Sequence, residues 1–228
     1  MRKTEFANGE YYHIYNRGVD KREVFLSDGD YTRFIVGMNE FNRIEAIGSL
    51  YEKNYREKLV AIQGAKSPIG DLAPNAVNNP EIKKLVEIIY YCLNPNHYHF
   101  VLRQLQKNGI SKFMLKISSG YTAYFNKKHA RSGSLFQGPF KSIHIDSNEY
   151  LLHLSVYVNA NHAIHNYPEK DWPCSSYLDY TGKRDGKLCV KETILGQFDN
   201  DPLEYEKFMQ NNIDYFREKK ELEKYILE

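Results

Sequence analysis

The sequence contains few of the features that mark secreted or membrane proteins. Its 228 residues include only three cysteines, which show neither CxxC spacing nor the density of a disulfide scaffold. No stretch approaches the roughly 18 apolar residues of a membrane span, and the first residues lack the apolar segment of a signal peptide. These absences predict a cytoplasmic globular protein with reduced, structural cysteines and no membrane partner.

A large net charge is also absent, because the balance is only +2. The charges are nevertheless unevenly distributed. Residues 104–145 hold seven lysines and arginines and no acid, whereas residues 199–228 hold nine acids and five bases. Clustered cations displace counterions from a nucleic-acid backbone, so the first segment is a candidate phosphate-facing surface. The alternative is that these cations are only the solvated side of a helix.

Hydrophobic periodicity predicts strands that alternate with helices. The expected elements in chain order are a strand at 10–17, a helix from 27 to 44, strands at 86–92 and 97–103, a helix at 111–129, a strand that ends at 145 and a helix at 147–162. The short polar segment between the two middle strands favours a hairpin. The pattern predicts an α+β fold, in which helices pack on one face of an antiparallel sheet.

The length suits one domain with an appendage. Residues 64–79 are rich in proline, glycine and asparagine, which indicates a surface insertion. We place the main domain at residues 1–182 and a helical extension of unknown role at 183–228. The apolar residues of that extension either pack on the domain or bind a partner; they are Leu203, Tyr205, Phe208, Met209 and Ile213.

His97 and His99 are candidate metal ligands. They lie two residues apart on a predicted strand, so both side chains leave the same face, with α-carbons about 6 to 7 Å apart. Two imidazoles at that separation can reach one metal ion. The spacing alone is equally consistent with an ordinary buried pair of histidines.

Tyr157 and Asn161 lie four residues apart on a predicted helix and would share one face. Tyrosine is a poor nucleophile with a pKa near 10, and a metal ion that polarises a phosphate would assist its attack. One tyrosine among nineteen is more often structural than catalytic, so this pattern needs support from elsewhere in the chain.

Five sequence blocks, in a fixed order, provide that support. The first block is YHI at 12–14 together with Arg17, Gly18, Val24, Phe25, Asp30, Tyr31 and Phe34. The other four are NPNHYHF at 94–100, GSLFQG at 133–138, YVNAN at 157–161 and DWPCSSY at 171–177. The ordered set resembles the REP-associated tyrosine transposases, relatives of the insertion-sequence (200-type) transposases in the single-tyrosine HUH class. The blocks extend over roughly three-quarters of the chain.

The resemblance implies a ferredoxin-like HUH palm that cleaves and rejoins single-stranded DNA during transposition. Tyr157 would attack a phosphodiester, giving a 5′-phosphotyrosine and a free 3′-hydroxyl. His97, His99 and Asn161 would hold Mg²⁺ or Mn²⁺, and imidazole ligands suit Mn²⁺ better than Mg²⁺. Asn161 would take the place of the glutamine found in distant relatives.

The implied partner is single-stranded DNA with hairpin elements, and a homodimer is kept open. Cations and aromatic rings would bind the strand. The residues assigned to DNA binding are Arg17, Lys112, Lys116, Lys127, Lys128, Arg131 and Lys141.

The chain departs from the family pattern at three positions. Tyr98 replaces the small aliphatic residue usual between the histidines; we expect its ring to face away from the metal, and a tyrosine would be accepted there if its hydroxyl reaches water. His162 replaces a proline after the helix asparagine; it offers a further imidazole near the site, but a histidine exposed on a helix is more often simply solvated. Pro139 replaces an arginine, so one phosphate contact is missing.

Other functions are compatible with the same residues. A non-catalytic nucleic-acid binder would present aromatic rings such as Tyr11, Tyr90 and Tyr91 to bases and would need neither metal nor Tyr157. A hydrolase would use the histidines to activate water without a covalent intermediate. A replication initiator or relaxase is the nearest alternative within the HUH class.

Overall fold

The computed structural model describes residues 5–53, 82–164 and 172–226, with side chains up to residue 218. Within these residues the strands form one antiparallel sheet in the order β2-β3-β1-β4. The strands are β1 (Tyr11–Arg17), β2 (Val86–Asn94), β3 (His97–Gln104) and β4 (Lys141–Ile145). The predicted insertion at 64–79 lies outside the described residues.

The first two long helices complete a ferredoxin-like unit. Helix α1 (Asp28–Glu40) follows β1, and α3 (Gly109–Lys128) follows β3, so the chain runs β1-α1-β2-β3-α3-β4. That order of elements, with this strand order, is the split βαβ arrangement. The predicted α+β fold with an antiparallel sheet is therefore confirmed, including the hairpin of β2 and β3.

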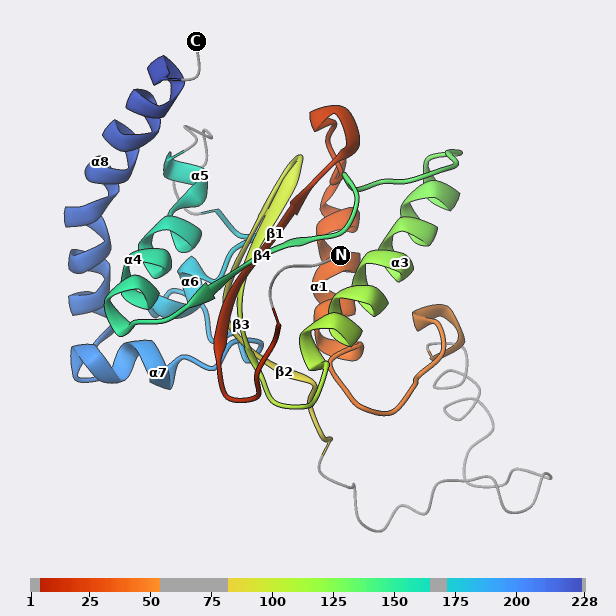
Figure 1. Cartoon of the computed structure of the whole chain (residues 1–228), viewed down its shortest axis with the longest axis horizontal. Coiled ribbons are helices and arrows are strands. Elements are labelled where there is room, and N and C mark those ends of the chain that lie inside the picture. The colour runs from red at the N-terminus through yellow and green to blue at the C-terminus, as the bar shows by residue number, and fades with distance from the viewer. Residues whose placement is uncertain (1–4, 54–81, 165–171, 227–228) are drawn as a thin grey trace.

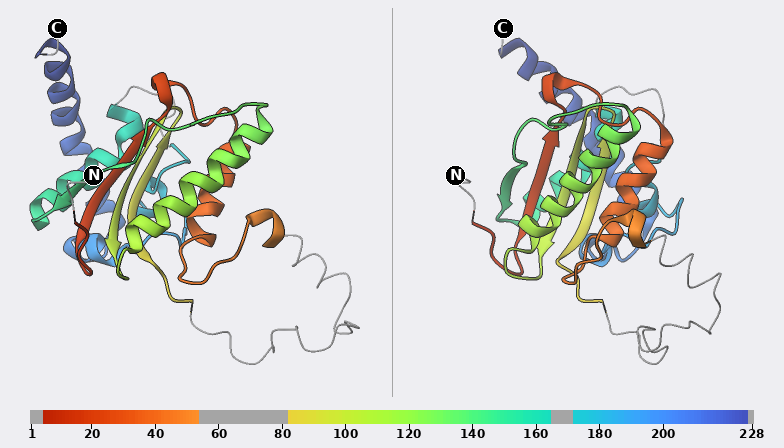
Figure 2. Two further views of the ribbon diagram at one scale, coloured as in Figure 1. Left: turned by 45° about the vertical axis from the view of Figure 1, so that its right-hand side comes forward. Right: turned by 90° about the vertical axis from the view of Figure 1, so that its right-hand side faces the viewer.

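Helices cover both faces of the sheet, not one as predicted. Helices α1 and α3 lie on one face, whereas α4 (Asn148–Asn159), α5 (Asn161–Ile164) and the long α8 (Pro202–Ile226) lie on the other (Figures 1 and 2). Strand β2 explains this difference, because all of its residues except Glu87 are buried. A strand with apolar side chains on both faces requires cover on both faces.

The two faces of the sheet carry different kinds of side chain. On the α1 and α3 side, Phe34 of α1 packs against Tyr98 and Phe100 of β3, and all three rings are almost fully buried. On the other side, the hydroxyl of Tyr90 donates a hydrogen bond to the Leu151 carbonyl at 2.6 Å, which ties α4 to β2. Helix α4 thereby lies over the strands that carry the histidines.

The C-terminal residues pack on the rest of the protein. Short helices α6 (Tyr177–Tyr180) and α7 (Glu192–Leu195) lead into α8, which contacts α4, α5 and α6. Tyr205 and Met209 of α8 are fully buried, whereas Leu203 is 62% exposed. The predicted helix is thus present, and two of its apolar residues join the main core. The domain boundary at residue 182 stays a prediction.

The three cysteines are free thiols, as predicted. Within the described residues, no helix is both long enough and apolar enough to span a membrane.

Candidate active site

A pocket of about 400 Å³ opens where the ends of β1 and β3 meet helix α4. His97 and His99 of β3, Tyr157 of α4, and the cations Arg17 and Lys141 line it. The remaining lining residues are Tyr15, Asn16, Lys21, Asn96, Tyr98 and Gln137. The structure therefore brings the two predicted ligands, the predicted nucleophile and two predicted DNA-binding residues to one cavity.

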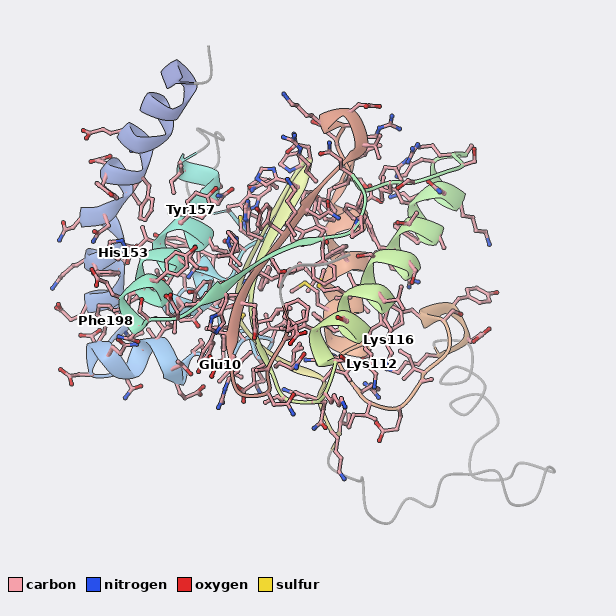
Figure 3. The ribbon with its side chains drawn as sticks, viewed as in Figure 1. Glu10, Lys112, Lys116, His153, Tyr157 and Phe198 are labelled. Carbon is pink, nitrogen blue, oxygen red and sulfur yellow. The ribbon has the colours of Figure 1, made fainter. Side chains whose placement is uncertain are left out.

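The strand register places these side chains on the face that α4 covers. In the β1–β3 pair, Tyr15 is opposite His99 and Arg17 is opposite His97. Residues directly opposite each other in an antiparallel pair share a face. The Tyr157 ring meets His99 edge to face, with ring centroids 5.5 Å apart. Figure 3 shows Tyr157 on α4, on the opposite side of the sheet from α3.

Neighbouring asparagines determine which ring nitrogen of His97 carries the proton. Its Nδ1 lies 2.6 Å from the Asn96 Oδ1, and the Asn96 Nδ2 donates to the Lys21 carbonyl at 3.2 Å. The second bond orients the Asn96 amide, so its oxygen faces His97 and accepts a proton from Nδ1. The Nε2 of His97 then carries the lone pair, the form in which imidazole binds a metal.

Asn161 reaches the same nitrogen of His97 from another element. Its Oδ1 lies 3.3 Å from the His97 Nε2, and the Asn94 Nδ2 donates to this oxygen at 2.5 Å and lies 2.9 Å from the same Nε2. The His97 Nε2 and the Asn161 Oδ1 therefore both accept from the same amide group of Asn94. A cation placed between them would be held in the same way.

The prediction that Tyr157 and Asn161 share one face of a single helix is wrong, because the two residues lie on different helices. Helix α4 ends at Asn159, and Ala160 leaves the helical conformation, so Asn161 begins the separate short helix α5. Asn161 is fully buried and directed at His97, whereas Tyr157 is partly exposed in the pocket. The break lets the two side chains approach the histidines from different directions.

His13 of β1 belongs to the site, although the sequence pattern indicated it only as part of the YHI block and predicted no role for it. Its Nε2 lies 2.9 Å from the Nδ1 of His99, and its ring is 5% exposed. Burial lowers the pKa of His13 to about 4, so the ring is neutral at neutral pH. Alternation along β1 would have placed His13 on the face of Tyr15, but its contact with His99 depends on the β1–β3 register.

A compact turn connects β1 to the pocket rim. The Gly18 amide donates to the Asn96 carbonyl at 2.8 Å, and a Cβ at Gly18 would lie 2.2 Å from the Arg22 carbonyl oxygen, so no larger residue fits. Lys21, in the following short helix η1 (Val19–Lys21), has a φ of 58° and lines the pocket. Lys21 was not among the predicted DNA-binding residues.

Two departures from the family pattern behave differently from the predictions. The Tyr98 ring faces away from the histidines, as expected, but it is fully buried and packs on Phe100, so its hydroxyl does not reach solvent. His162 is 2% exposed rather than solvated, because α5 folds against β2. Tyr98 is thus part of the aromatic core beneath the site.

The other predicted DNA-binding cations lie on or next to α3. Figure 3 shows Lys112 and Lys116 on the far side of the sheet from Tyr157. Lys116 donates to the Arg43 carbonyl, and Lys128 forms an ion pair with Asp30. Lys127 lines a second, largely apolar groove together with Lys116, and Arg131 donates to the Asn126 side chain. The structure therefore divides the predicted set between two surfaces.

The candidate ligand set is unusual for a protein metal site because it includes an amide. Among the described residues, no three His, Cys, Asp or Glu side chains lie close enough to form a metal site by themselves. The set His97, His99 and Asn161 still fits a divalent ion, since the Nδ1 of each histidine is engaged by a neighbour and the Asn161 oxygen faces His97. Imidazole and carbonyl donors together suit Mn²⁺.

Comparisons with known proteins bear on the family and on the fold. Residues 51–161 match the family described as "Transposase IS200 like". A solved structure of a REP-associated tyrosine transposase bound to a REP hairpin is similar over 80% of this chain and 86% of that one, with a TM-score of 0.50 and 14% identity. At that identity the likeness shows the fold. No curated protein sequence matches the chain.

The matched segment contains both histidines, Tyr157 and Asn161. The resemblance inferred from the sequence blocks is therefore confirmed: residues 51–161 match the IS200-like transposase family, on a fold similar to that of a REP-associated tyrosine transposase.

Proposed function

We propose that this protein cleaves and rejoins single-stranded DNA through a covalent bond to Tyr157. The observation that carries the proposal is the position of the Tyr157 ring, 5.5 Å from His99 in the pocket that also holds His97. A nucleophile beside a pair of side chains able to bind a metal is an arrangement suited to phosphodiester transfer. The match to the IS200-like transposases supports the same reaction.

In the cleavage step, the Tyr157 oxygen forms a bond to phosphorus and the bond from phosphorus to the 3′-oxygen breaks. The tyrosine loses its proton, and the departing 3′-oxygen gains one. The 5′-phosphate remains on Tyr157 as a phosphotyrosine. Because this ester retains the energy of the phosphodiester, a second 3′-hydroxyl can displace Tyr157 and join two strands without ATP.

His97, His99 and Asn161 would hold Mg²⁺ or Mn²⁺, which would polarise the scissile phosphate and stabilise the leaving oxygen. The protein supplies the orientation. The asparagines around His97 fix its proton on Nδ1, and α4 holds Tyr157 over the sheet. These ligands and Tyr157 all come from one chain, so the proposed reaction does not require a second copy.

The strand would enter over the pocket rim. Arg17, Lys21 and Lys141 line the same pocket as Tyr157 and would be the cations that neutralise phosphates next to the scissile bond. The α3 surface, with Lys112, Lys116, Lys127, Lys128 and Arg131, would then contact the backbone of a hairpin beside the cleavage site. The similar solved structure, of a transposase bound to a REP hairpin, supports a folded DNA partner.

A purely non-catalytic binder is a weaker reading of the structure. Tyr90 and Tyr91, two of the aromatic residues on which that alternative relied, are buried at 0% and 3% exposure and do not offer a face to bases. Tyr11 is partly buried beneath the Arg103 guanidinium, which lies 5.6 Å above its ring. The aromatic side chains of the sheet therefore serve the core more than a binding surface.

The direct test is incubation of the protein with end-labelled single-stranded DNAs that contain hairpins. With Mg²⁺ or Mn²⁺ we expect a labelled protein–DNA adduct that survives a denaturing gel, together with a shorter strand that ends in a 3′-hydroxyl. EDTA should remove both products. Cleavage without any adduct would replace the covalent mechanism with hydrolysis by activated water. Binding without cleavage across a hairpin library would contradict an enzymatic role.

The two cationic surfaces make separable predictions. Lys141→Gln should weaken binding of an unstructured single strand about threefold to tenfold and reduce the slope of log Kd against log salt by about one. Lys112→Gln should leave that binding unchanged but weaken binding of a hairpin. Fluorescence anisotropy at several salt concentrations measures both effects. If Lys141→Gln and Lys112→Gln weaken binding of the unstructured strand equally, the proposal that this strand binds at the pocket rim is wrong.

A further inference from the structure

His13 lies beside His99 on the same face of the sheet, and the proposed reaction assigns it no step. Its Nε2 is 2.9 Å from the Nδ1 of His99, and the two rings are nearly parallel, with centroids 5.2 Å apart. We propose that His13 is a positioning residue that holds His99 in the tautomer able to bind a metal. The inference deepens the proposed function and rests on His99 being a ligand.

Metal binding by His99 would require one direction of this hydrogen bond, which the positions of the two nitrogens alone leave open. Between two neutral imidazoles, one nitrogen must donate its proton and the other must accept it. If His99 donates from Nδ1, its Nε2 carries the lone pair that a metal needs. If His13 donates instead, His99 is protonated at Nε2 and cannot bind a metal through that atom. Metal binding through Nε2 therefore requires His13 to accept at Nε2 and to carry its own proton at Nδ1.

His97 is held by a similar hydrogen bond from its Nδ1, with Asn96 as the partner. Its Nδ1 donates to the Asn96 oxygen, which leaves the lone pair on Nε2. Metal-bound histidines in proteins commonly donate their second nitrogen to a nearby acceptor, which fixes the tautomer and the ring orientation. His13 and Asn96 thus have equivalent places around the two candidate ligands, one on β1 and one in the hairpin turn.

The ring of His13 is buried and packed against other rings. It stacks on Tyr15, with centroids 5.0 Å apart, and its edge faces Tyr157 at 6.3 Å. The side chain is 5% exposed, so water competes little for its contact with His99. A contact from β1 therefore supports a ligand on β3 under the helix that carries the nucleophile.

The test compares His13→Gln with His13→Leu, each in a Tyr157→Phe background so that no cleavage occurs. The glutamine amide oxygen can accept the proton of His99, whereas leucine fills similar space with no acceptor. The Kd for Mn²⁺ is measured from the electron paramagnetic resonance signal of the free ion. We expect His13→Leu to raise this Kd about 10- to 100-fold and His13→Gln to remain within a few-fold of the parent.

Equal Mn²⁺ affinity in the leucine variant, with an unchanged melting temperature of the metal-free protein, would overturn the proposal. A nitrogen-15 NMR spectrum of the histidines provides a second readout without metal. The His99 Nδ1 should be protonated in the parent and in His13→Gln, and should lose this preference in His13→Leu. If the parent binds no Mn²⁺, the metal-dependent function fails, and a His99 tautomer that is the same in all three proteins would overturn the inference separately.

Discussion

Tyr157→Phe is expected to abolish the covalent adduct and to lower strand cleavage at least about 1,000-fold, which corresponds to about 4 kcal/mol in activation free energy. The substitution removes only the hydroxyl. The ring contacts with His99 and with Phe216 of α8 remain, so the fold and the pocket should be preserved. The measurement is single-turnover cleavage of a hairpin-containing strand, with the adduct followed on a denaturing gel.

Tyr150→Phe is the matched control. Tyr150 lies on the same helix and is also partly buried, but it does not line the pocket with the histidines. We expect its loss of hydroxyl to change cleavage less than threefold. DNA affinity should be unaltered in both variants. An adduct of undiminished yield in Tyr157→Phe would show that another residue attacks the phosphate.

Arg184→Met is expected to cost about 3 to 5 kcal/mol in the free energy of unfolding, the range for a buried charge that loses its partner. Asp179 of α6 is 3% exposed, and Arg184 donates to both of its carboxylate oxygens, at 2.5 and 2.8 Å. Arg184 also donates to the carbonyls of Pro173 and Ser175. These bonds anchor the segment that packs against β2.

Chemical denaturation measures the loss of unfolding free energy in Arg184→Met. Two further variants test its cause. Asp179→Asn combined with Arg184→Met should recover part of the loss, because the uncompensated charge is then absent. Arg217→Met breaks an exposed ion pair with Asp214 and should cost less than about 0.5 kcal/mol. A loss in Arg184→Met as small as that in Arg217→Met would show that the Asp179 carboxylate is adequately solvated without its partner.

Local periodicity was sufficient to predict most of the framework. The hairpin of β2 and β3, helix α3 and the cap of α4 follow from apolar spacing and turn residues near each element. Serine is a favoured residue at the start of a helix, and the Ser147 hydroxyl accepts a hydrogen bond from the Tyr150 amide. These features depend on neighbours within a few residues, which a single sequence displays directly.

The parts that were missed depend on contacts between distant segments. The continuous apolar run of β2 indicates that both faces of the sheet are covered. The spacing of apolar residues does not indicate which helix covers the second face. The break at Ala160 has no glycine or proline to mark it. The bond between His13 and His99 joins residues 86 positions apart, so only the strand register reveals it.

The central place of β1 also determines when a chain leaving the ribosome acquires its proposed activity. This strand is synthesised first, yet it lies between β3 and β4, and its pairing of Tyr15 with Lys141 must wait for most of the chain. Pairings between such distant segments form slowly because long loops must close first. A nascent chain therefore carries no complete proposed site until β4 and α4 have emerged.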